Sequence, residues 1–294
     1  MSCTDRNLFV SASDGLRLFA RDYGPAEGGG ALPVVCLPGL ARNSEDFHDL
    51  AHALSTDANH PRRVLALDYR GRGRSEWASD WHQYNLGTER DDILQVLRVA
   101  GIEKAVFIGT SRGGLHIMAL SAMKPALVAG AVLNDVGPVI EAGGLMRIRD
   151  YVGRLPTPAT LQEGAQILEQ RSGAQFPAFG PQQWEAMARG TWHEESGRLA
   201  LSSDPNLMKT LEVLDLEKPL PDLWNLFEHM LPVPVLVIRG ENSDLVSQST
   251  LAAMQECHPR LTTLTVPGQG HAPLLDGAIL PSIKDQILAA EASI

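Results

Sequence analysis

A serine flanked by glycines is the residue of this chain best suited to nucleophilic chemistry. Ser111 lies in the pentapeptide Gly109–Gly113 (GTSRG), after the apolar run Ala105–Ile108 and before a helix-like segment. A G-x-S-x-G sequence between a strand and a helix is typical of a sharp turn that exposes the serine Oγ. Glycines two residues before and after the serine remove the Cβ atoms that would collide in such a turn. We therefore predict that Ser111 is a nucleophile.

A histidine on a glycine-rich loop is the candidate base for this serine. A serine is a weak nucleophile unless a base removes its proton and a carboxylate orients that base. Of the nine histidines, His271 lies in the loop 267–273 (PGQGHAP), directly after the apolar run Thr262–Val266. A loop without bulky neighbours at the carboxyl end of a late strand allows a histidine to reach the nucleophile. We therefore predict that His271 is the base.

The acid that orients the histidine has one preferred candidate and two others. In the chain order typical of a G-x-S-x-G protein, the acid lies between the serine and the histidine. Asp244 lies on the loop after the apolar run Val233–Ile238, and Glu241 is a rival on the same loop. Asp135 follows the earlier run Ala129–Leu133 and is the alternative position. We predict Asp244 as the acid and place Asp135 second.

These residues need a scaffold, and the apolar patterning predicts a mostly parallel sheet. Short Val-, Ile- and Leu-rich runs bounded by Gly, Pro or Asp are typical of strands buried on both faces of such a sheet. A hairpin with Asp14 and Gly15 at its turn precedes them. Helix-like segments alternate with the runs, which indicates an α/β fold with helices on both faces. The six runs are Leu32–Leu37, Arg63–Leu67, Ala105–Ile108, Ala129–Leu133, Val233–Ile238 and Thr262–Val266.

The stretch 138–230 interrupts this alternation. It contains helix-like pieces, repeated Pro and Gly and no convincing strand, so we expect a helical cap (lid) inserted into a core formed by 1–137 and 231–294. Most aromatic side chains of the stretch should pack within the cap, and some should roof an apolar pocket over Ser111. The apolar candidates are Phe176, Phe179, Trp184, Met187, Trp192, Trp224 and Phe227, of which Trp184, Trp192 and Trp224 are the predicted substrate-binding residues.

Composition and charge exclude several other classes of protein. The 294 residues are 44% hydrophobic and 20% charged, which argues against a disordered or coiled-coil chain. The net charge of −10 disfavours a nucleic-acid-binding surface or an anchor to anionic membranes. The three cysteines are scattered and match no disulfide or zinc-binding pattern. No apolar run reaches the ~18 residues that span a bilayer, and no secretory signal is visible, so we expect a soluble cytoplasmic protein.

Nearly the whole chain resembles the α/β-hydrolase fold family. Besides the serine, acid and histidine in that order, Leu37–Leu40 (LPGL) resembles the loop after the family's third strand, where many members have His-Gly instead. The segment Asp68–Ser75 resembles the family's D-x-R-G-x-G-x-S turn, and Asn134–Gly137 resembles its exit into a lid. The resemblance implies an eight-stranded, mostly parallel sheet with an inserted helical cap. It also implies an oxyanion hole formed by the backbone N–H groups of Leu40 and Arg112.

Several arginines near these motifs have expected structural roles. The side chain of Arg112, an unusual residue after the nucleophile, should form a buried or half-buried ion pair, for which Asp135 is a candidate partner. Arg70, Arg72 and Arg74 could be read as an anion site. In a turn of this family they more often bind carboxylates and carbonyls of their own fold, so we expect a structural role.

The resemblance and the triad together predict an enzyme. We expect a serine hydrolase that cleaves a small to medium, largely apolar carboxylic ester (or a lactone or thioester) through an acyl-enzyme, without a metal or organic cofactor. A carbon–carbon bond hydrolase or an acyltransferase would use the same triad, and a small-ligand receptor or pseudoenzyme would share the fold. Dehalogenases and epoxide hydrolases are disfavoured because their chemistry needs a carboxylate at position 111. The expected partner is a small-molecule ester, with no nucleic acid and no membrane, and the expected state is a monomer or homodimer.

Overall fold

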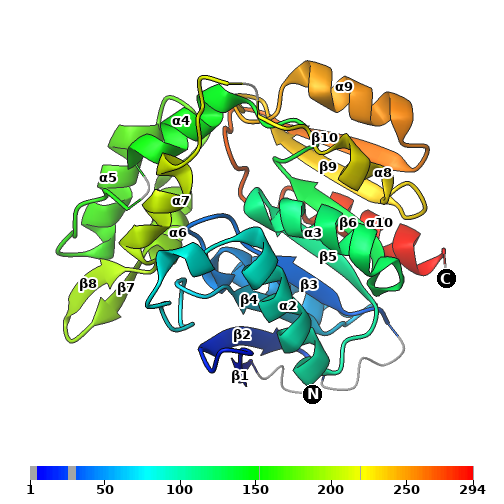
Figure 1. The fold of residues 1–294 in the computed structure, drawn as a ribbon, viewed down its shortest axis with the longest axis horizontal. Helices are drawn as coiled ribbons and strands as arrows, with labels where there is room; N and C mark the ends of the chain where they lie inside the picture. The colour runs from blue at the N-terminus through cyan, green and yellow to red at the C-terminus, as the bar shows by residue number, and fades with distance from the viewer. Residues whose placement is uncertain (1–4, 26–30, 152, 219, 294) are drawn as a thin grey trace.

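A mixed eight-stranded sheet forms the centre of the structure (Figure 1). The computed structural model describes residues 5–25, 31–151, 153–218 and 220–293. The strand order is β1-β2-β4-β3-β5-β6-β9-β10, with antiparallel pairing of β1 with β2 and of β2 with β4, and parallel pairing elsewhere. This arrangement confirms the predicted fold class. The strands are β1 (Arg6–Ser11), β2 (Arg17–Tyr23), β3 (Val34–Leu37), β4 (Val64–Asp68), β5 (Ala105–Thr110), β6 (Val128–Asn134), β9 (Val235–Gly240) and β10 (Leu261–Val266).

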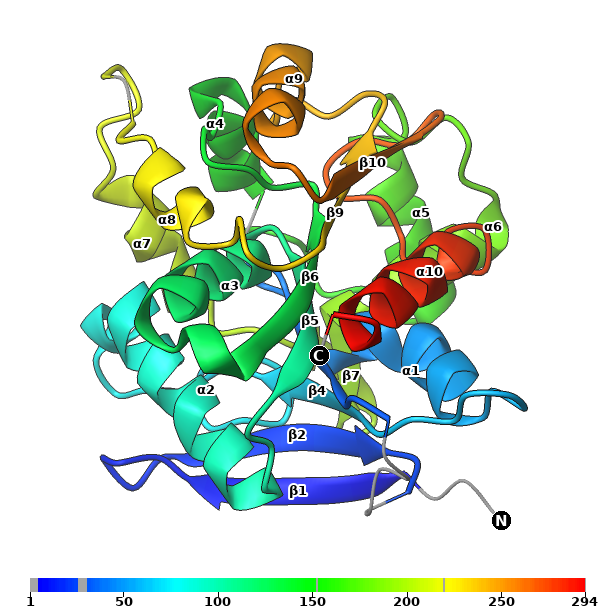
Figure 2. The same cartoon turned by 90° about the vertical axis from the view of Figure 1, so that its right-hand side faces the viewer.

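Helices cover both faces of the sheet and produce two apolar cores (Figure 2). Because successive side chains of a strand point to opposite faces, Val35 and Leu37 of β3 join one core, while Val34 and Cys36 join the other. This two-sided burial explains the continuous apolar runs of the inner strands. One face packs against α2 (Leu86–Ala100), α3 (Arg112–Met123), α8 (Trp224–Glu228) and α9 (Gln248–Cys257), and the other against α1 (His48–Ser55) and α10 (Leu280–Glu291).

A cap lies between β6 and β9 in the chain, at the left of Figure 1. It contains α4 (Ala142–Tyr151), α5 (Leu161–Ser172), α6 (Pro181–Thr191) and α7 (Lys209–Glu212). It also contains an antiparallel hairpin of β7 (Trp192–Glu195) and β8 (Arg198–Leu201), so the expectation that this stretch holds no strand is wrong. The hairpin turn is Ser196-Gly197, two residues with positive φ, as a two-residue turn of this kind requires.

The last helix of this stretch, α8, packs away from the rest of the cap. Phe227 is fully buried in the core between the sheet and α3, and Trp224 packs against the same core. The two rings meet edge to face, with centroids 5.8 Å apart. The aromatic side chains of α8 therefore stabilise the helix layer on the sheet.

Candidate functional site

Ser111 lies at a sharp turn between β5 and α3. Its backbone adopts φ 52° and ψ −113°, a strained conformation for a residue with a side chain. The flanking glycines are required by close approach: a Cβ on Gly109 would lie 2.5 Å from the backbone of Gly113, and one on Gly113 would lie 2.0 Å from the carbonyl oxygen of Leu37. Strand, turn and helix are thus packed too tightly for larger residues, and the serine side chain is held at the end of the sheet.

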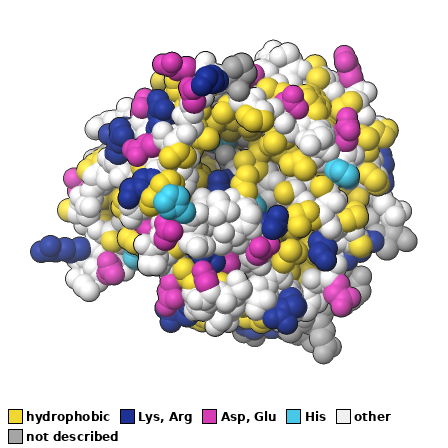
Figure 3. Space-filling view, in the orientation of Figure 1, with side chains coloured by type: hydrophobic (Ala, Val, Ile, Leu, Met, Phe, Trp, Pro, Cys, Tyr) yellow, Lys and Arg dark blue, Asp and Glu magenta, His cyan; other side chains and the backbone are white. Residues whose placement is uncertain are grey.

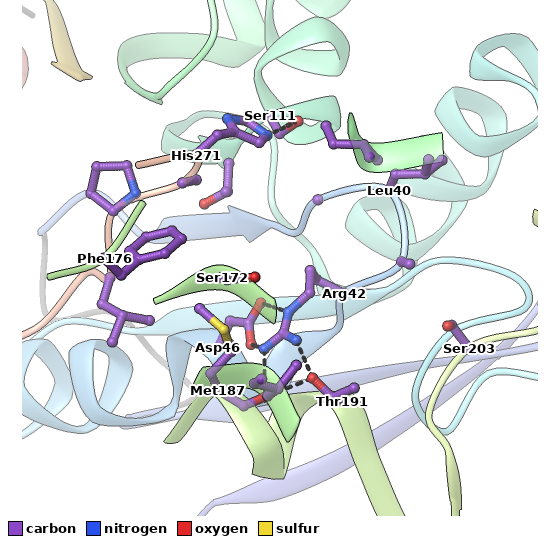
Figure 4. A pocket seen from close by; sticks show the side chains of 18 of the residues that line it. Leu40, Arg42, Asp46, Ser111, Ser172, Phe176, Met187, Thr191, Ser203 and His271 are labelled. Atoms are coloured by element: carbon purple, nitrogen blue, oxygen red, sulfur yellow. Dashed lines mark hydrogen bonds and ion pairs between the residues drawn. The ribbon is translucent and has the colours of Figure 1, made fainter. Parts of the chain in front are cut away.

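His271 reaches Ser111 from the loop after β10. Its Nε2 lies 3.0 Å from the serine Oγ, within hydrogen-bond distance (Figure 4). The side chain is only 6% exposed. The structure therefore places the predicted nucleophile and base in contact, in the geometry needed for transfer of the hydroxyl proton.

The carboxylate beside the histidine belongs to Asp135. Its Oδ2 lies 2.7 Å from Nδ1 of His271, and its side chain is fully buried. The backbone N–H of Gly240 donates to Oδ1 at 3.0 Å, and the Ser243 hydroxyl donates to Oδ2 at 2.7 Å. With one carboxylate oxygen held by an amide and the other by a hydroxyl, the acid has a fixed orientation toward the imidazole.

The prediction that Asp244 contacts the histidine is wrong. Its carboxylate binds the guanidinium of Arg147 on α4 through two hydrogen bonds of 2.6 and 2.8 Å, and accepts another from Gln175 at 3.0 Å. Burial raises the pKa of Asp244, but the Arg147 ion pair outweighs this and holds the pKa below its usual value. The rival Glu241 lies elsewhere too, because its side chain accepts a hydrogen bond from the backbone N–H of Gly268. Asp244 thus joins the core to the cap.

The predicted oxyanion hole consists of the backbone N–H groups of Leu40 and Arg112. Arg112 is the first residue of α3, where the helical hydrogen-bonding pattern gives a backbone N–H no acceptor. The carbonyl of Gly39 accepts from the backbone N–H of Arg42 at 3.2 Å, so the N–H of Leu40, in the same trans peptide as that carbonyl, points the opposite way. Arg72 donates to the carbonyl of Leu40 at 2.7 Å and further fixes this loop.

The Arg112 side chain binds Glu89 and not Asp135, which corrects the suggested pairing. Its Nε donates to Oε2 of Glu89 at 2.6 Å. Glu89, fully buried on α2, also binds Arg72 at 2.7 Å and contacts Nε2 of His116 at 3.1 Å. Burial raises the pKa of Glu89, but the two guanidinium groups outweigh it and hold the pKa well below its usual range. This cluster lies beneath the serine turn, and the sequence reasoning missed it.

The other arginines of the Asp68–Ser75 turn bind their own fold, as expected. Arg70 pairs with Asp92 at 2.6 Å and Asp14 at 2.8 Å. Arg74 lies over the ring of Phe19, 4.2 Å from its centroid. These contacts fix the loops around the site.

A cavity of about 160 Å³ opens between the cap and Ser111, and Figure 3 shows the corresponding hollow with largely hydrophobic walls. Two of the seven apolar candidates line it, Phe176 and Met187. Further apolar walls come from α4, the loop between α4 and α5, α5, β8 and the loops of the core, with the side chains of Leu40, Ile148, Leu155, Leu168, Leu201, Leu274 and Leu275.

None of the three tryptophans predicted to bind substrate lines this cavity. Trp184 and Trp192 are buried in the small core of the cap with Ala165, Leu168 and Ala188. Trp224 packs on the main core, as described above. Because a large ring is most easily buried where several helices meet, the tryptophans stabilise the cap and the helix layer instead of roofing the cavity.

Within the described ranges, no group of three or more His, Cys, Asp or Glu side chains is arranged to hold a metal ion. The described helices include none that is both long and apolar enough to cross a bilayer.

Comparison with known proteins agrees with this fold. The sequence profile of the alpha/beta hydrolase fold family matches residues 33–278, so the chain belongs to that family. It is 34% identical over 255 residues to a 3-hydroxybutyrate-oligomer hydrolase of Cupriavidus necator, covering 82% of each chain. It is 27% identical over 248 residues to a 2-(acetamidomethylene)succinate hydrolase of Mesorhizobium japonicum, covering 83% of each chain.

Solved structures show the same architecture. A crystal structure of an alpha/beta hydrolase from Novosphingobium aromaticivorans superimposes with a TM-score of 0.89 and is 38% identical, covering 98% of this chain and 100% of the other. The E-2-(acetamidomethylene)succinate hydrolase structure has a TM-score of 0.78 at 25% identity, covering 97% of this chain. The chain is therefore an α/β hydrolase in fold over nearly all its length.

Proposed function

We propose that this protein is a serine hydrolase that cleaves small to medium, largely apolar carboxylic esters through an acyl-enzyme. The observation that carries the proposal is the continuous contact from Ser111 through His271 to Asp135, with distances of 3.0 and 2.7 Å. A buried carboxylate, an imidazole and a hydroxyl in this order are the parts of a nucleophilic triad. The apolar walls of the adjoining cavity support a hydrophobic ester over a sugar or a polyanion.

The mechanism follows from the roles that the geometry permits. Nε2 of His271 takes the Ser111 proton as Oγ attacks the ester carbonyl carbon, and Asp135 stabilises the resulting imidazolium. The tetrahedral oxyanion lies between the backbone N–H groups of Leu40 and Arg112. The ester C–O bond then breaks, and the alcohol leaves with the proton from His271. Water, deprotonated by the same nitrogen, attacks the acyl-enzyme and releases the carboxylic acid and the free serine.

The relatives support ester chemistry. Hydroxy acids condense to oligomers through ester bonds, and the Cupriavidus necator relative is named as a hydrolase of 3-hydroxybutyrate oligomers. Another relative, from Mycobacterium tuberculosis and 26% identical over 254 residues, is named as an esterase. A water-dependent cleavage of an ester is the reaction that these names and the triad share.

The test is a rapid-mixing experiment with the p-nitrophenyl esters of acetate, butyrate and hexanoate. An acyl-enzyme should give a burst of p-nitrophenol close to one equivalent per active site if deacylation is slower than acylation. A fluorophosphonate probe should modify Ser111 in the unaltered protein and no residue in Ser111→Ala, which should also lose turnover by several orders of magnitude. Undiminished turnover in Ser111→Ala, or modification at another serine, would exclude this mechanism.

A further inference from the structure

The cavity beside Ser111 carries an excess of positive charge, in a chain whose net charge is −10. Its charged lining residues are three arginines (Arg42, Arg147 and Arg171) and one aspartate, Asp46. Figure 3 shows a basic side chain inside the otherwise hydrophobic hollow. An apolar ester alone would need no cationic wall. The partners of each arginine show which of these charges is neutralised within the protein.

Arg42 is neutralised within the protein. Its guanidinium binds the carboxylate of Asp46, with Nε 2.8 Å from Oδ2, and donates to the hydroxyl of Thr191 at 2.6 Å and the carbonyl of Met187 at 3.2 Å (Figure 4). These contacts join the loop after β3 to α6 of the cap. Arg42 therefore stabilises the cavity wall and adds little net charge to the cavity.

Arg147 is also paired with a carboxylate. Asp244, which does not line the cavity, binds it through two hydrogen bonds from the core side. The ion pair is about one-third exposed on each side, with side-chain exposures of 29% and 32%. Asp244 therefore orients Arg147 and offsets its charge.

Arg171 differs from both. It lies in the last turn of α5, where Leu168, Arg171 and Ser172 line the cavity at helical spacings of three and four residues. The residue is exposed, and no carboxylate of the described ranges forms an ion pair with it. Its neighbour Ser172 also lines the cavity (Figure 4). One cationic side chain on the cap wall thus lacks a counterion from the described protein.

We propose that the ester substrate carries a free carboxylate on the part that lies against the cap, and that Arg171 binds this carboxylate. The inference rests on the proposed serine hydrolase function and narrows its substrate class to carboxylate-bearing esters. Ser111 and Arg171 of α5 both line this cavity, so such a substrate extends from Ser111 to the cap. Its aliphatic middle contacts Leu168, Phe176 and Met187, and its charged end meets the guanidinium.

The competing explanation is that Arg171 only complements the dipole at the carboxyl end of α5. A basic residue in the last turn stabilises a helix in this way. That role predicts a small loss of stability on substitution and no dependence on the charge of the substrate. Substrate charge is therefore the variable that separates the two roles.

The experiment uses two pairs of substrates that differ only in one charge. One pair is the linear dimer of a 3-hydroxy acid and its terminal carboxamide, which place the group on the alcohol side of the ester. The other pair is the mono-p-nitrophenyl ester of adipic acid and its terminal carboxamide, which place it on the acyl side. Turnover is measured for the unaltered protein, for Arg171→Gln and Arg171→Lys, and for Arg198→Gln. Arg198 is an exposed arginine of β8 that does not line the cavity, so its variant is the matched control.

For at least one pair, the unaltered protein should prefer the acid over the carboxamide by about tenfold in kcat/KM. Arg171→Gln should remove this preference by raising KM for the acid with kcat unchanged, because the carboxylate is bound equally in ground and transition states. Arg171→Lys should retain part of the preference for the acid over the carboxamide, and higher ionic strength should weaken this preference. Arg198→Gln should behave like the unaltered protein.

Two results would overturn the proposal: equal kcat/KM for acid and carboxamide in both pairs, or a loss in Arg171→Gln that is the same for both members. In either case, cleavage of p-nitrophenyl acetate and its loss in Ser111→Ala would leave the serine hydrolase assignment intact. If the unaltered protein cleaved none of these esters, the proposed function itself would fail. The two failures are therefore distinguishable.

Discussion

The carboxylate of Asp135 lies 2.7 Å from Nδ1 of His271, although the two residues are 136 positions apart in the chain. The contact forms because Asp135 directly follows β6 and His271 lies on the loop after β10, and both strands pair with β9. Carboxyl ends of neighbouring parallel strands meet at one edge of a sheet, where side chains from distant segments converge. The acid of the site is therefore supplied from the middle of the sheet.

Substitution of this acid should be far more damaging than substitution of Asp244. Asp135→Asn should lower kcat for an activated ester by about 10⁴-fold, because an amide favours the wrong imidazole tautomer. Asp244→Asn, which weakens a contact with the cap, should cost no more than about tenfold. Steady-state kinetics on p-nitrophenyl butyrate, with circular dichroism to verify folding, measures both. A larger loss of kcat in Asp244→Asn than in Asp135→Asn would show that Asp244 is the acid.

Cap residues that line the cavity should affect the choice of substrate, whereas Trp184, which does not line it, should affect stability. Phe176→Ala and Met187→Ala remove cavity walls, so they should change KM and the ranking of acyl chain lengths, and spare acetate esters. Trp184→Ala empties the core of the cap and should lower the free energy of unfolding by about 3–5 kcal/mol. Kinetics across a series of p-nitrophenyl esters and urea denaturation test this. Equal scaling of kcat/KM for every ester in Phe176→Ala would contradict it.

The cluster around Glu89 should make the stability of the fold sensitive to acid. A carboxyl whose pKa is lower in the folded state stabilises the protein at pH values above its unfolded pKa, near 4.5, and loses this contribution as the pH falls below it. Burial lowers the pKa of His116 from 6.5, so its protonation also favours the unfolded state as the pH decreases. The free energy of unfolding should therefore decline below pH 6.5 and more steeply below 4.5, as measured by urea titrations at several pH values.

A variant isolates the contribution of the carboxylate. Glu89→Gln leaves Arg72 and Arg112 buried without their counterion and should cost about 3–5 kcal/mol at pH 7. Its stability should also lose the steep decline below pH 4.5. Asp91→Asn, on the same helix with a side chain 63% exposed, should change stability by less than about 0.5 kcal/mol. An unchanged acid profile in Glu89→Gln would refute the prediction.

Two glycine variants test the tight packing of the serine turn. Gly113→Ala places a methyl group 2.0 Å from the carbonyl oxygen of Leu37, so it should destabilise the protein by about 3 kcal/mol or more and abolish activity. Gly143→Ala, in α4 with no atom within 4 Å of the new methyl group, should stabilise it by about 0.5–1 kcal/mol. Thermal denaturation followed by circular dichroism compares the two. A fully stable, active Gly113→Ala protein would show that the turn can adjust.

The sheet and the serine turn were predictable because local signals specify them. Continuous apolar runs indicated the buried strands, and the G-x-S-x-G sequence indicated the close approach of strand and helix. The acid was not predictable by the same reasoning, because Asp135 and Asp244 both follow strands that pair with each other, at the same edge of the sheet. Only the direction of each side chain separates them, and that depends on contacts with Ser243 and Arg147.

The cavity walls were predicted poorly because residue size was a misleading guide. On α6, Trp184, Met187, Ala188 and Thr191 lie at spacings of three, four and seven residues and so share one broad face, yet Met187 and Thr191 line the cavity while Trp184 and Ala188 are buried in the core of the cap. Helical spacing therefore does not separate the residues that line the cavity from those that fill the core of the cap. The hairpin β7–β8 was missed although Ser196-Gly197 is a turn signal, because each strand has only four residues and β7 is mostly polar.

The adjacency of Ser243 and Asp244 has a consequence for the design of hybrid enzymes. Ser243 donates to the triad carboxylate, and the next residue binds Arg147 and Gln175 of the cap. A cap transplanted from a relative without partners for Asp244 would release this loop and, with it, the hydroxyl that orients Asp135. Exchange of caps to obtain new specificities should therefore succeed only when the loop 240–246 and the two cap residues that bind it are transferred as one unit.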